Sequence, residues 1–320
     1  MAERVEREVR LDVPANLLLL GEYAVLEPGG VGLAVAPDVA TTAVFTPAPR
    51  GYGSVVRGVL GSGTVAWPGD AGILGRVADA LTGVYGRFDG EIEIDTRALF
   101  EPDGRKRGLG SSAAMTVALT AVWPVAAGRP RTNAADILRH AVEIHRLAQG
   151  GTGSGYDVAT SALGGHVLFT GGREPTASRV DLPWLPPMRL FPGASAVATR
   201  AAVSAYREWR RESPGAAQRF LARSNELVRE FVGAAGWAAA RRVFDAHRTL
   251  GIELGDAIGV SARIGPPEDV QRSDAALSDA DPLDVTWKAV GAGSELGVLL
   301  PADSRDPHTI AVSPEGIRWG

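Results

Sequence analysis

The sequence lacks cysteine altogether and contains only two lysines, Lys106 and Lys288, among its 33 basic residues. Without cysteine the chain has no disulfide bond, no thiolate metal ligand and no cysteine nucleophile. No stretch approaches the ~20 consecutive apolar residues that a membrane-spanning helix needs. The first ten residues, MAERVEREVR, have no apolar signal core. These absences favour a cytoplasmic protein with no membrane partner.

The chain also lacks a surplus of basic charge. Its 33 lysine and arginine residues are outnumbered by 37 aspartate and glutamate residues, and the formal net charge is -4. Proteins that bind nucleic acid generally carry a basic footprint, so no nucleic-acid partner is expected. The content of 45% hydrophobic and 22% charged residues is typical of a soluble globular protein. A length of 320 residues predicts two domains.

Hydrophobic periodicity predicts strands and helices mixed in both halves, without a strict βαβ alternation. The fold class is therefore expected to be α+β. The segment 171–193 is rich in proline and glycine, and we place the domain boundary there, with domains at 1–180 and 181–320. Strands are expected at 7–13, 31–36, 41–45, 91–95, 166–170, 285–288 and 297–300. Helices are expected at 70–85, 111–123, 133–149, 157–163, 216–233 and 237–250.

Glycine is abundant, at 40 residues of 320, and clusters in short loops that carry the chemistry. The first loop, 108–114, opens a helix that contains no charge. Glycines allow an anion to approach the backbone, and the free N–H groups and the dipole of a helix N-terminus favour a phosphate there. Two serine hydroxyls on the first turn can bond phosphate or ligate Mg²⁺. Lys106, flanked by Arg105 and Arg107, supplies positive charge.

Two other phosphate motifs are excluded for this loop. The string also matches Gly-x-Gly-x-x-Ala, but a dinucleotide fingerprint follows a strand and has an acidic residue about 20 positions later. Here a polar loop precedes the glycines, and no acidic residue occurs before Asp136. A Walker A loop needs Gly-Lys, which the chain does not contain. Taken alone, a simple glycine turn capped by serine remains an equally good interpretation.

Two further glycine-rich segments complete the set. Residues 149–157 read Gln-Gly-Gly-Thr-Gly-Ser-Gly-Tyr-Asp, and an aspartate in such a place is usually a helix cap. Residues 288–297 read Lys-Ala-Val-Gly-Ala-Gly-Ser-Glu-Leu-Gly, which predicts a tight turn between strands, or a plain hairpin. Each segment is ambiguous by itself. The three together, in this order, are far more specific.

The combination resembles the GHMP kinase superfamily. The segment 14–26, Pro-Ala-Asn-Leu-Leu-Leu-Leu-Gly-Glu-Tyr-Ala-Val-Leu, is similar to the N-terminal motif of that superfamily. The details of this motif and of 148–159 are most similar to the phosphomevalonate kinase branch. The resemblance covers 9–172 well and 287–300 fairly. It implies an N-terminal domain like domain 2 of ribosomal protein S5 and a ferredoxin-like C-terminal domain.

The resemblance also implies a set of site residues, with ATP and Mg²⁺ as ligands. Asp157 matches the catalytic aspartate, and Lys106 is expected to act with it. The phosphates of ATP would be held by Gly108, Leu109, Gly110, Ser111, Ser112 and Ala113. Mg²⁺ would lie near Ser112, with Glu22 as a weaker candidate ligand. The acceptor would be bound by Asn16, Glu22, Ser154, Gly155, Lys288, Gly291 and Gly293.

The sequence departs from the family pattern at two positions. Asn16 stands where mevalonate and phosphomevalonate kinases have a lysine, which leaves the partner of Asp157 and the identity of the acceptor open. Arg146 stands where mevalonate kinases have a metal-binding glutamate, and we interpret it as facing an extra anionic group. His140 and His145 lie five residues apart, so they do not share a helix face, and we expect packing or surface roles for both.

The expected function is ATP-dependent phosphoryl transfer to a small acidic metabolite. By resemblance this is the conversion of phosphomevalonate to its diphosphate in isoprenoid biosynthesis. With a phosphate acceptor, which is already mostly dianionic, Asp157 would orient and balance charge. With an alcohol acceptor, as in mevalonate or homoserine kinases, it would take the proton. A catalytically silent ligand-binding relative is the third possibility.

Overall fold

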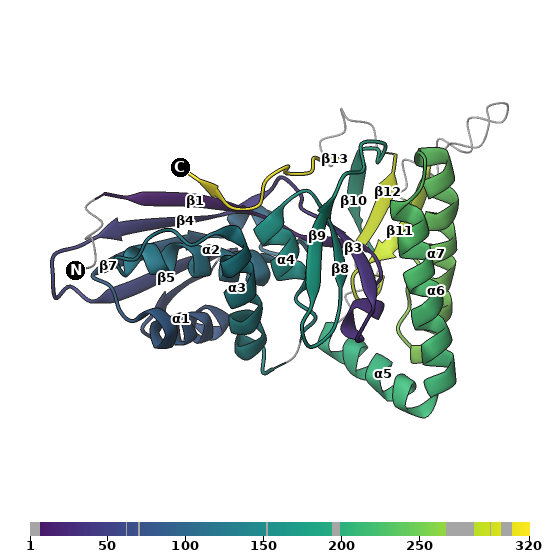
Figure 1. Cartoon of the computed structure of the whole chain (residues 1–320), viewed down its shortest axis with the longest axis horizontal. Helices are drawn as coiled ribbons and strands as arrows, with labels where there is room; N and C mark the ends of the chain where they lie inside the picture. The colour runs from purple at the N-terminus through teal and green to yellow at the C-terminus, as the bar shows by residue number, and fades with distance from the viewer. Residues whose placement is uncertain are drawn as a thin grey trace.

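The computed structural model describes residues 7–61, 63–69, 71–151, 153–193, 199–266, 285–294, 296–301 and 309–320. Within these residues the chain forms three sheets and seven α-helices. Figure 1 shows helices α1 to α4 gathered on one sheet at one end of the molecule and the long helices α6 and α7 at the other end. The predicted α+β class is confirmed.

The largest sheet has six strands in the order β14-β1-β4-β7-β5-β6. Its neighbouring strands are antiparallel except β5 and β7, which run parallel. The last strand of the chain pairs with the first, so the C-terminal segment returns to the N-terminal sheet (Figure 1). The bounds are β1 (Val9–Pro14), β4 (Ala40–Pro47), β5 (Ser54–Leu60), β6 (Gly63–Trp67), β7 (Gly90–Asp95) and β14 (Arg318–Trp319).

Two four-stranded antiparallel sheets complete the structure. One has the order β2-β3-β8-β9 and contains β2 (Leu17–Leu20), β3 (Val31–Val35), β8 (His166–Thr170) and β9 (Thr176–Val180). The other has the order β11-β12-β10-β13 and contains β10 (Met188–Pro192), β11 (Thr286–Val290), β12 (Leu296–Leu300) and β13 (Thr309–Ile310). The expected turn after Lys288 therefore joins two adjacent strands, β11 and β12.

The helices are divided between these sheets. Helix α2 packs on β1 and β4 and is surrounded by α1, α3 and α4, whereas α6 packs on β3 and α7 on β11. The bounds are α1 (Gly72–Tyr85), α2 (Ser111–Ala126), α3 (Ala134–Ala148), α4 (Tyr156–Leu163), α5 (Thr199–Glu212), α6 (Pro214–Val232) and α7 (Trp237–Ile258). Two short 3₁₀ helices are η1 (Ala24–Leu26) and η2 (Arg97–Leu99).

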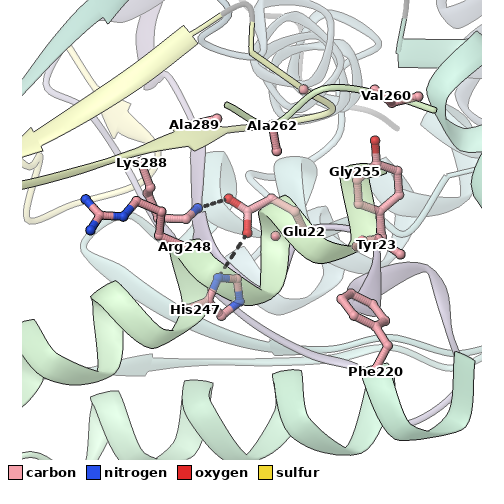
Figure 2. Close-up of a pocket in the computed structure, with 14 residues that line it drawn as sticks. Glu22, Tyr23, Phe220, His247, Arg248, Gly255, Val260, Ala262, Lys288 and Ala289 are labelled. Carbon is pink, nitrogen blue, oxygen red and sulfur yellow. Dashed lines mark hydrogen bonds and ion pairs between the residues drawn. The ribbon is translucent and has the colours of Figure 1, made fainter. Parts of the chain in front are cut away.

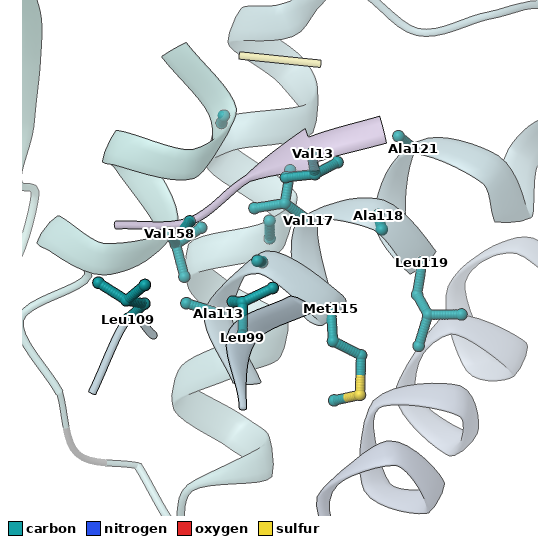
Figure 3. Close-up of a cluster of buried hydrophobic side chains, with 14 of the residues drawn as sticks. Val13, Leu99, Leu109, Ala113, Met115, Val117, Ala118, Leu119, Ala121 and Val158 are labelled. Atoms are coloured by element: carbon teal, nitrogen blue, oxygen red, sulfur yellow. The ribbon is translucent and has the colours of Figure 1, made fainter. Parts of the chain in front are cut away.

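Helix α2 is the centre of the main hydrophobic core. Every residue from Ala113 to Val125 is buried, as the absence of charge in this segment predicts. Figure 3 shows its side chains between Leu109 in the preceding loop, Val13 of β1 and Val158 of α4. Complete burial of a valine, leucine or methionine side chain stabilises the folded protein by about 1.5–3 kcal/mol. The loop that precedes α2 is therefore attached, through Leu109, to the main hydrophobic core.

Three helix predictions need correction. Pro124 does not stop α2 but lies inside its last turn, and the helix ends at Ala126. Proline removes one hydrogen bond, which costs least where the helix is already ending. Helix α7 continues past residue 250 to Ile258, since Gly251 and Gly255 interrupt its pattern without ending it. Helix α5 was not predicted, because only Ala202 and Tyr206 of its residues are buried.

The other predicted elements are confirmed. The helix at 133–149 is observed as α3, and the side chain of Asn133 accepts a hydrogen bond from the N–H of Asp136, as a capping residue should. Among the helices of the described residues, none combines the length and the hydropathy needed to cross a membrane.

Candidate active site

The phosphate loop, defined here as residues 108–112, is held in place by the first strand segment. The N–H of Asn16 donates to the carbonyl of Leu109 (3.1 Å), and its side-chain amide donates to the carbonyl of Gly110 (3.2 Å). Gly110 has a left-handed conformation (φ 67°), and a Cβ there would lie 2.0 Å from Asn16 Oδ1. Only glycine fits this conformation and this close contact.

The loop ends at the N-terminus of a 16-residue helix, which begins at Ser111. The first N–H groups of an α-helix have no partner within the helix. The N–H groups of Ala113 and Ala114 bond back to the carbonyl of Gly110, whereas those of Ser111 and Ser112 have no hydrogen bond recorded among the described residues. These N–H groups and the Ser112 hydroxyl are the groups that the sequence predicts to bind an anion.

Asn16 itself is placed inside the protein. Its side chain is 2% exposed and donates a second hydrogen bond to Ser161 Oγ on α4 (2.9 Å). Asn16 thus joins the phosphate loop to the helix that carries Asp157. Its contact with a substrate stays a prediction. The recorded hydrogen bonds connect the phosphate loop to α4.

Asp157 lies in the first turn of α4, after Gly155, which has φ 93° and caps the helix. Asp157 Oδ1 accepts a hydrogen bond from the N–H of Val158 (2.9 Å), and Oδ2 lies 3.5 Å from Nε2 of His145. Burial raises the pKa of Asp157. The hydrogen bond and the charge interaction with His145, helped by backbone N–H groups, outweigh this effect and hold the pKa of Asp157 below its usual value. Asp157 is therefore an ionised carboxylate near neutral pH.

His145 is a residue of this site that the sequence did not reveal. Its side chain is 4% exposed, and it comes from α3, twelve positions before Asp157. Its ring also contacts Thr116 Oγ1 on α2 (3.0 Å) and Gln149 Nε2 (2.7 Å). The expected packing role was based on helix spacing alone. The only signal in the sequence was that Gln149 opens the second glycine-rich motif four residues later.

Arg146 does not face an extra anionic group, and that interpretation is corrected. All three of its guanidinium nitrogens donate to backbone carbonyls of two neighbouring loops, at 2.8–3.3 Å. The acceptors are the carbonyls of Gly153, Ser154, Gly172 and Arg173. These contacts fix the glycine-rich segment before Asp157, where Ser154 is buried. A forked guanidinium can satisfy several carbonyls at once, which a carboxylate could not.

A cavity of about 450 Å³ lies beside the phosphate loop. Its polar lining comes from three distant parts of the chain: Glu22 and Tyr23, Glu101 and Arg105 to Gly108, and Gly291 to Gly293, with Tyr156 of α4. Apolar residues such as Leu17, Val25, Phe191 and Leu296 line the rest. This volume lies within the range of small-molecule sites, roughly 300–1,000 Å³. Lys106, Gly108, Glu22, Gly291 and Gly293 are thus brought together as the sequence predicts.

The segment around Tyr23 joins the N-terminal motif to the third glycine loop. Tyr23 is the one non-glycine residue with positive φ (63°) in the described part of the chain. Its hydroxyl donates to the carbonyl of Ala292 (2.6 Å). Burial, and secondarily the charge of Glu22, raise the pKa of Tyr23 to about 12, so the phenol keeps its proton. A conformation of this kind is retained where the surroundings fix it, and often at functional sites.

Glu22 and Lys288 form a buried ion pair beneath the cavity. Figure 2 shows Lys288 Nζ and the Glu22 carboxylate pointing toward each other, with His247 of α7 on the other side of the carboxylate. Lys288 also donates to the carbonyl of Leu19 (3.1 Å). Burial raises the pKa of Glu22 and lowers that of Lys288, and the contact between them opposes both shifts. The expected roles of Glu22 as metal ligand and of Lys288 as acceptor ligand stay predictions.

Parts of this chain match a known family model and a curated protein. Residues 73–165 match the family model described as GHMP kinases N terminal domain. The phosphomevalonate kinase of Streptomyces sp. (strain CL190) is 31% identical over 195 residues, which cover 51% of this chain and 50% of that protein. The match therefore spans about half the length of this curated relative.

Solved structures extend the likeness to nearly the whole chain. A Lin0012 protein from Listeria innocua has a TM-score of 0.79 at 19% identity and covers 98% of this chain and 99% of its own. The Streptococcus pneumoniae phosphomevalonate kinase, in complex with phosphomevalonate and AMPPNP, has a TM-score of 0.71 at 18% identity, covering 92% and 93%. At such identities the likeness concerns the fold. The resemblance to GHMP kinases and the α+β fold that it implied are confirmed.

Proposed function

We propose that this chain, which has the GHMP kinase fold and a GHMP kinase N-terminal domain, is an ATP-dependent kinase that phosphorylates a small acidic metabolite, phosphomevalonate. One observation carries the proposal. Lys106 and Gly108, which lead into the helix N-terminus at Ser111, line a cavity of small-molecule size, and Tyr156, the neighbour of the ionised Asp157 in the chain, lines it as well. Phosphoryl transfer needs this kind of positioning and charge neutralisation more than covalent chemistry.

The nucleotide phosphates would lie at the start of α2, bound by the N–H groups of Ser111 and Ser112. Lys106 on the cavity rim would neutralise charge on the transferred phosphoryl group. The residues present fit Mg²⁺, which is usually held by few protein ligands together with substrate phosphates. The Ser112 hydroxyl would be one such ligand, with Glu22 as a second. When bound, the ion would neutralise charge between the phosphates.

The acceptor would lie in the cavity between the phosphate loop and Gly291 to Gly293. Arg105 and Arg107, which flank Lys106 on the rim, favour an acidic acceptor. A phosphate acceptor is mostly dianionic at neutral pH and needs no base. Asp157 would then orient the reacting groups and balance their charge. The site would lie between our proposed domains 1–180 and 181–320, since residues from both line it.

A kinase with an alcohol acceptor is the second candidate, favoured by the contact between Asp157 and His145. An ionised carboxylate backed by an imidazole is a suitable general base for a hydroxyl group, which holds its proton tightly.

The test is an acceptor screen with the purified chain and Mg·ATP. ADP release would be followed with phosphomevalonate, mevalonate, homoserine or no acceptor, and ³¹P NMR would identify the product. We expect ADP release to depend on phosphomevalonate and a diphosphate signal to appear. Turnover with mevalonate or homoserine alone would establish the second candidate. Binding of nucleotide without turnover of any acceptor would identify a silent relative and overturn the proposal.

A further inference from the structure

The ring of His145 touches all three helices that build the site. Its Nδ1 contacts Thr116 of α2 (3.0 Å), its Nε2 lies 3.5 Å from Asp157 Oδ2 of α4, and Gln149 (2.7 Å from Nε2) follows at the end of its own helix, α3. Nothing in the resemblance assigned a role to this residue. Its position makes it the direct neighbour of the expected catalytic carboxylate.

The hydrogen bonds determine which nitrogen carries the proton. Thr116 donates its hydroxyl proton to the carbonyl of Ser112 (2.8 Å), so its oxygen accepts from Nδ1–H of His145. Nδ1 therefore carries a proton, and Nε2, which lies 2.7 Å from Gln149 Nε2 and 3.5 Å from Asp157 Oδ2, is the ring nitrogen that faces the carboxylate. Nε2 donates a hydrogen bond to Asp157 in the ring form that carries a proton on both nitrogens.

This arrangement connects the first turn of α2 to the carboxylate of Asp157. The contacts run from the Ser112 carbonyl through Thr116 and His145 to Asp157, whose other oxygen is held by the N–H of Val158 (2.9 Å). A carboxylate contacted at both oxygens has a defined rotamer. A shift of about 1 Å at such a group can cost roughly 100-fold in rate.

Few charged groups lie close to the His145 ring in the described residues. In the described part of the structure, Asp157 is the charged group recorded within 4 Å of His145. The partners from α2 and α3, Thr116 and Gln149, are neutral. The adjacent Arg146 directs its guanidinium to backbone carbonyls instead. Asp157 is therefore the carboxylate that the His145 ring faces.

We propose that His145 is a positioning residue of the kinase site, which is anchored by Thr116 and holds the Asp157 carboxylate in its orientation. The kinetic part of this proposal rests on the proposed function. The contact between His145 and Asp157 does not, and it can be measured without turnover.

The test uses two substitutions that separate the ring nitrogens. In His145→Asn the amide can replace Nδ1 and keep the contact with Thr116, but it cannot reach Asp157. In His145→Gln the amide can replace Nε2 and keep a hydrogen bond to Asp157. His140→Asn is the matched control, because His140 lies on the same helix and bonds to Tyr85 instead (2.6 Å). Thermal unfolding would be measured for all three.

The readouts are the NMR titration of the Asp157 carboxyl carbon and the pH dependence of kcat. We expect His145→Asn to raise the Asp157 titration by roughly one pH unit. It should also lower kcat roughly 10–100-fold with little change in KM. With an alcohol acceptor the acidic limb of kcat should move to higher pH, because Asp157 is then the base; with a phosphate acceptor the limb belongs to the substrate and should stay. His145→Gln should recover most of kcat, and His140→Asn should match the wild type.

Two outcomes would overturn the proposal. One is an Asp157 titration that is unchanged in His145→Asn. The other is an equal loss of activity in both His145 variants that follows their loss of thermal stability, as a packing residue would give. If the wild type phosphorylates no acceptor, the proposed function fails, and the carboxyl titration alone then decides whether His145 controls Asp157.

Discussion

Two buried histidines lie beside carboxylates in this molecule, and the two pairs have different surroundings. His145 Nε2 is 3.5 Å from Asp157, and His247 Nδ1 is 3.7 Å from Glu22. Each histidine side chain is 4% exposed. Glu22 has a lysine as its ion-pair partner, whereas the ionisable partner recorded for Asp157 within the described residues is the histidine.

Lys288 makes the electrostatic surroundings of the two histidines different. Burial, followed by the nearby charge of Lys288, lowers the pKa of His247 well below 6.5, so its ring stays neutral. The N–H of Gly21 donates to its Nε2 (3.0 Å), and its Nδ1 has no hydrogen-bond partner in the described structure. In the cluster the charge of Glu22 is paired with that of Lys288, and His247 adds no charge. Asp157, with 24% of its side chain exposed, keeps its charge available to a bound molecule.

From the comparison of the two pairs, we expect the largest effect from a substitution of Asp157, and we expect it on turnover. Asp157→Asn should reduce kcat about 100- to 10,000-fold if Asp157 is a base for an alcohol acceptor. With a phosphate acceptor the rate falls through lost orientation, and the acidic limb near pH 6 persists because it belongs to the substrate. Steady-state kinetics across pH measure both. Glu143→Gln, on the exposed face of α3, is the control. Full activity of Asp157→Asn at every pH would remove the catalytic assignment.

The next effect is on stability, at Lys288. Lys288→Met leaves Glu22 buried without its cation, and breaking such a pair costs about 3–5 kcal/mol in the free energy of unfolding. The measurement is urea denaturation near neutral pH. The double variant Glu22→Gln/Lys288→Met removes both charges and should recover most of the loss. If the single variant is as stable as the wild type, the cluster is not a structural ion pair.

Substitutions of the two lysines should affect different properties, catalysis for Lys106 and stability for Lys288. Lys106 is exposed on the cavity rim, whereas Lys288 is 3% exposed. Lys106→Ala should lower kcat/KM roughly 10- to 100-fold, since a hydrogen bond to a charged group is worth about 1.5–3 kcal/mol. Its unfolding free energy should stay unchanged. Arg211→Ala, in the exposed C-terminal turn of α5, serves for comparison. An equal loss of kcat/KM in Arg211→Ala would show that Lys106 has no special role.

The smallest effect is a pH dependence of stability at His247. Because its pKa is lowered in the folded protein, the unfolded chain binds more protons below pH 6.5. Stability contributed by the neutral ring is present above that pH and is lost as the pH falls, by at most about 1.4 kcal/mol per unit. His247→Gln, whose amide oxygen can still accept from Gly21, should flatten the slope between pH 6.5 and 5.

His166 provides a check on that slope. Burial also lowers its pKa, but its side chain is only partly buried in β8. His166→Asn should therefore change the slope less than His247→Gln. Identical slopes in His247→Gln and the wild type would show that His247 does not couple folding to pH.

The sequence by itself determined the elements whose signals are local. Glycines at 108 and 110 require left-handed backbone, the uncharged segment from Ser111 requires burial, and Asn133 caps its own helix. Each of these depends on residues within a few positions. The phosphate loop, helices α2 and α3 and the place of Asp157 at the start of α4 were therefore predictable.

Only the tertiary structure decided which charges meet. Glu22 and Lys288 are 266 positions apart, and no periodicity relates them. The same holds for Asn16 and Ser161, 145 positions apart, and for the ring of His145, which lies between helices that the spacing of histidines cannot orient. Pairing of this kind follows from how sheets and helices pack. The sequence therefore placed both lysines beside glycine loops, and folding buried one and left the other facing the cavity.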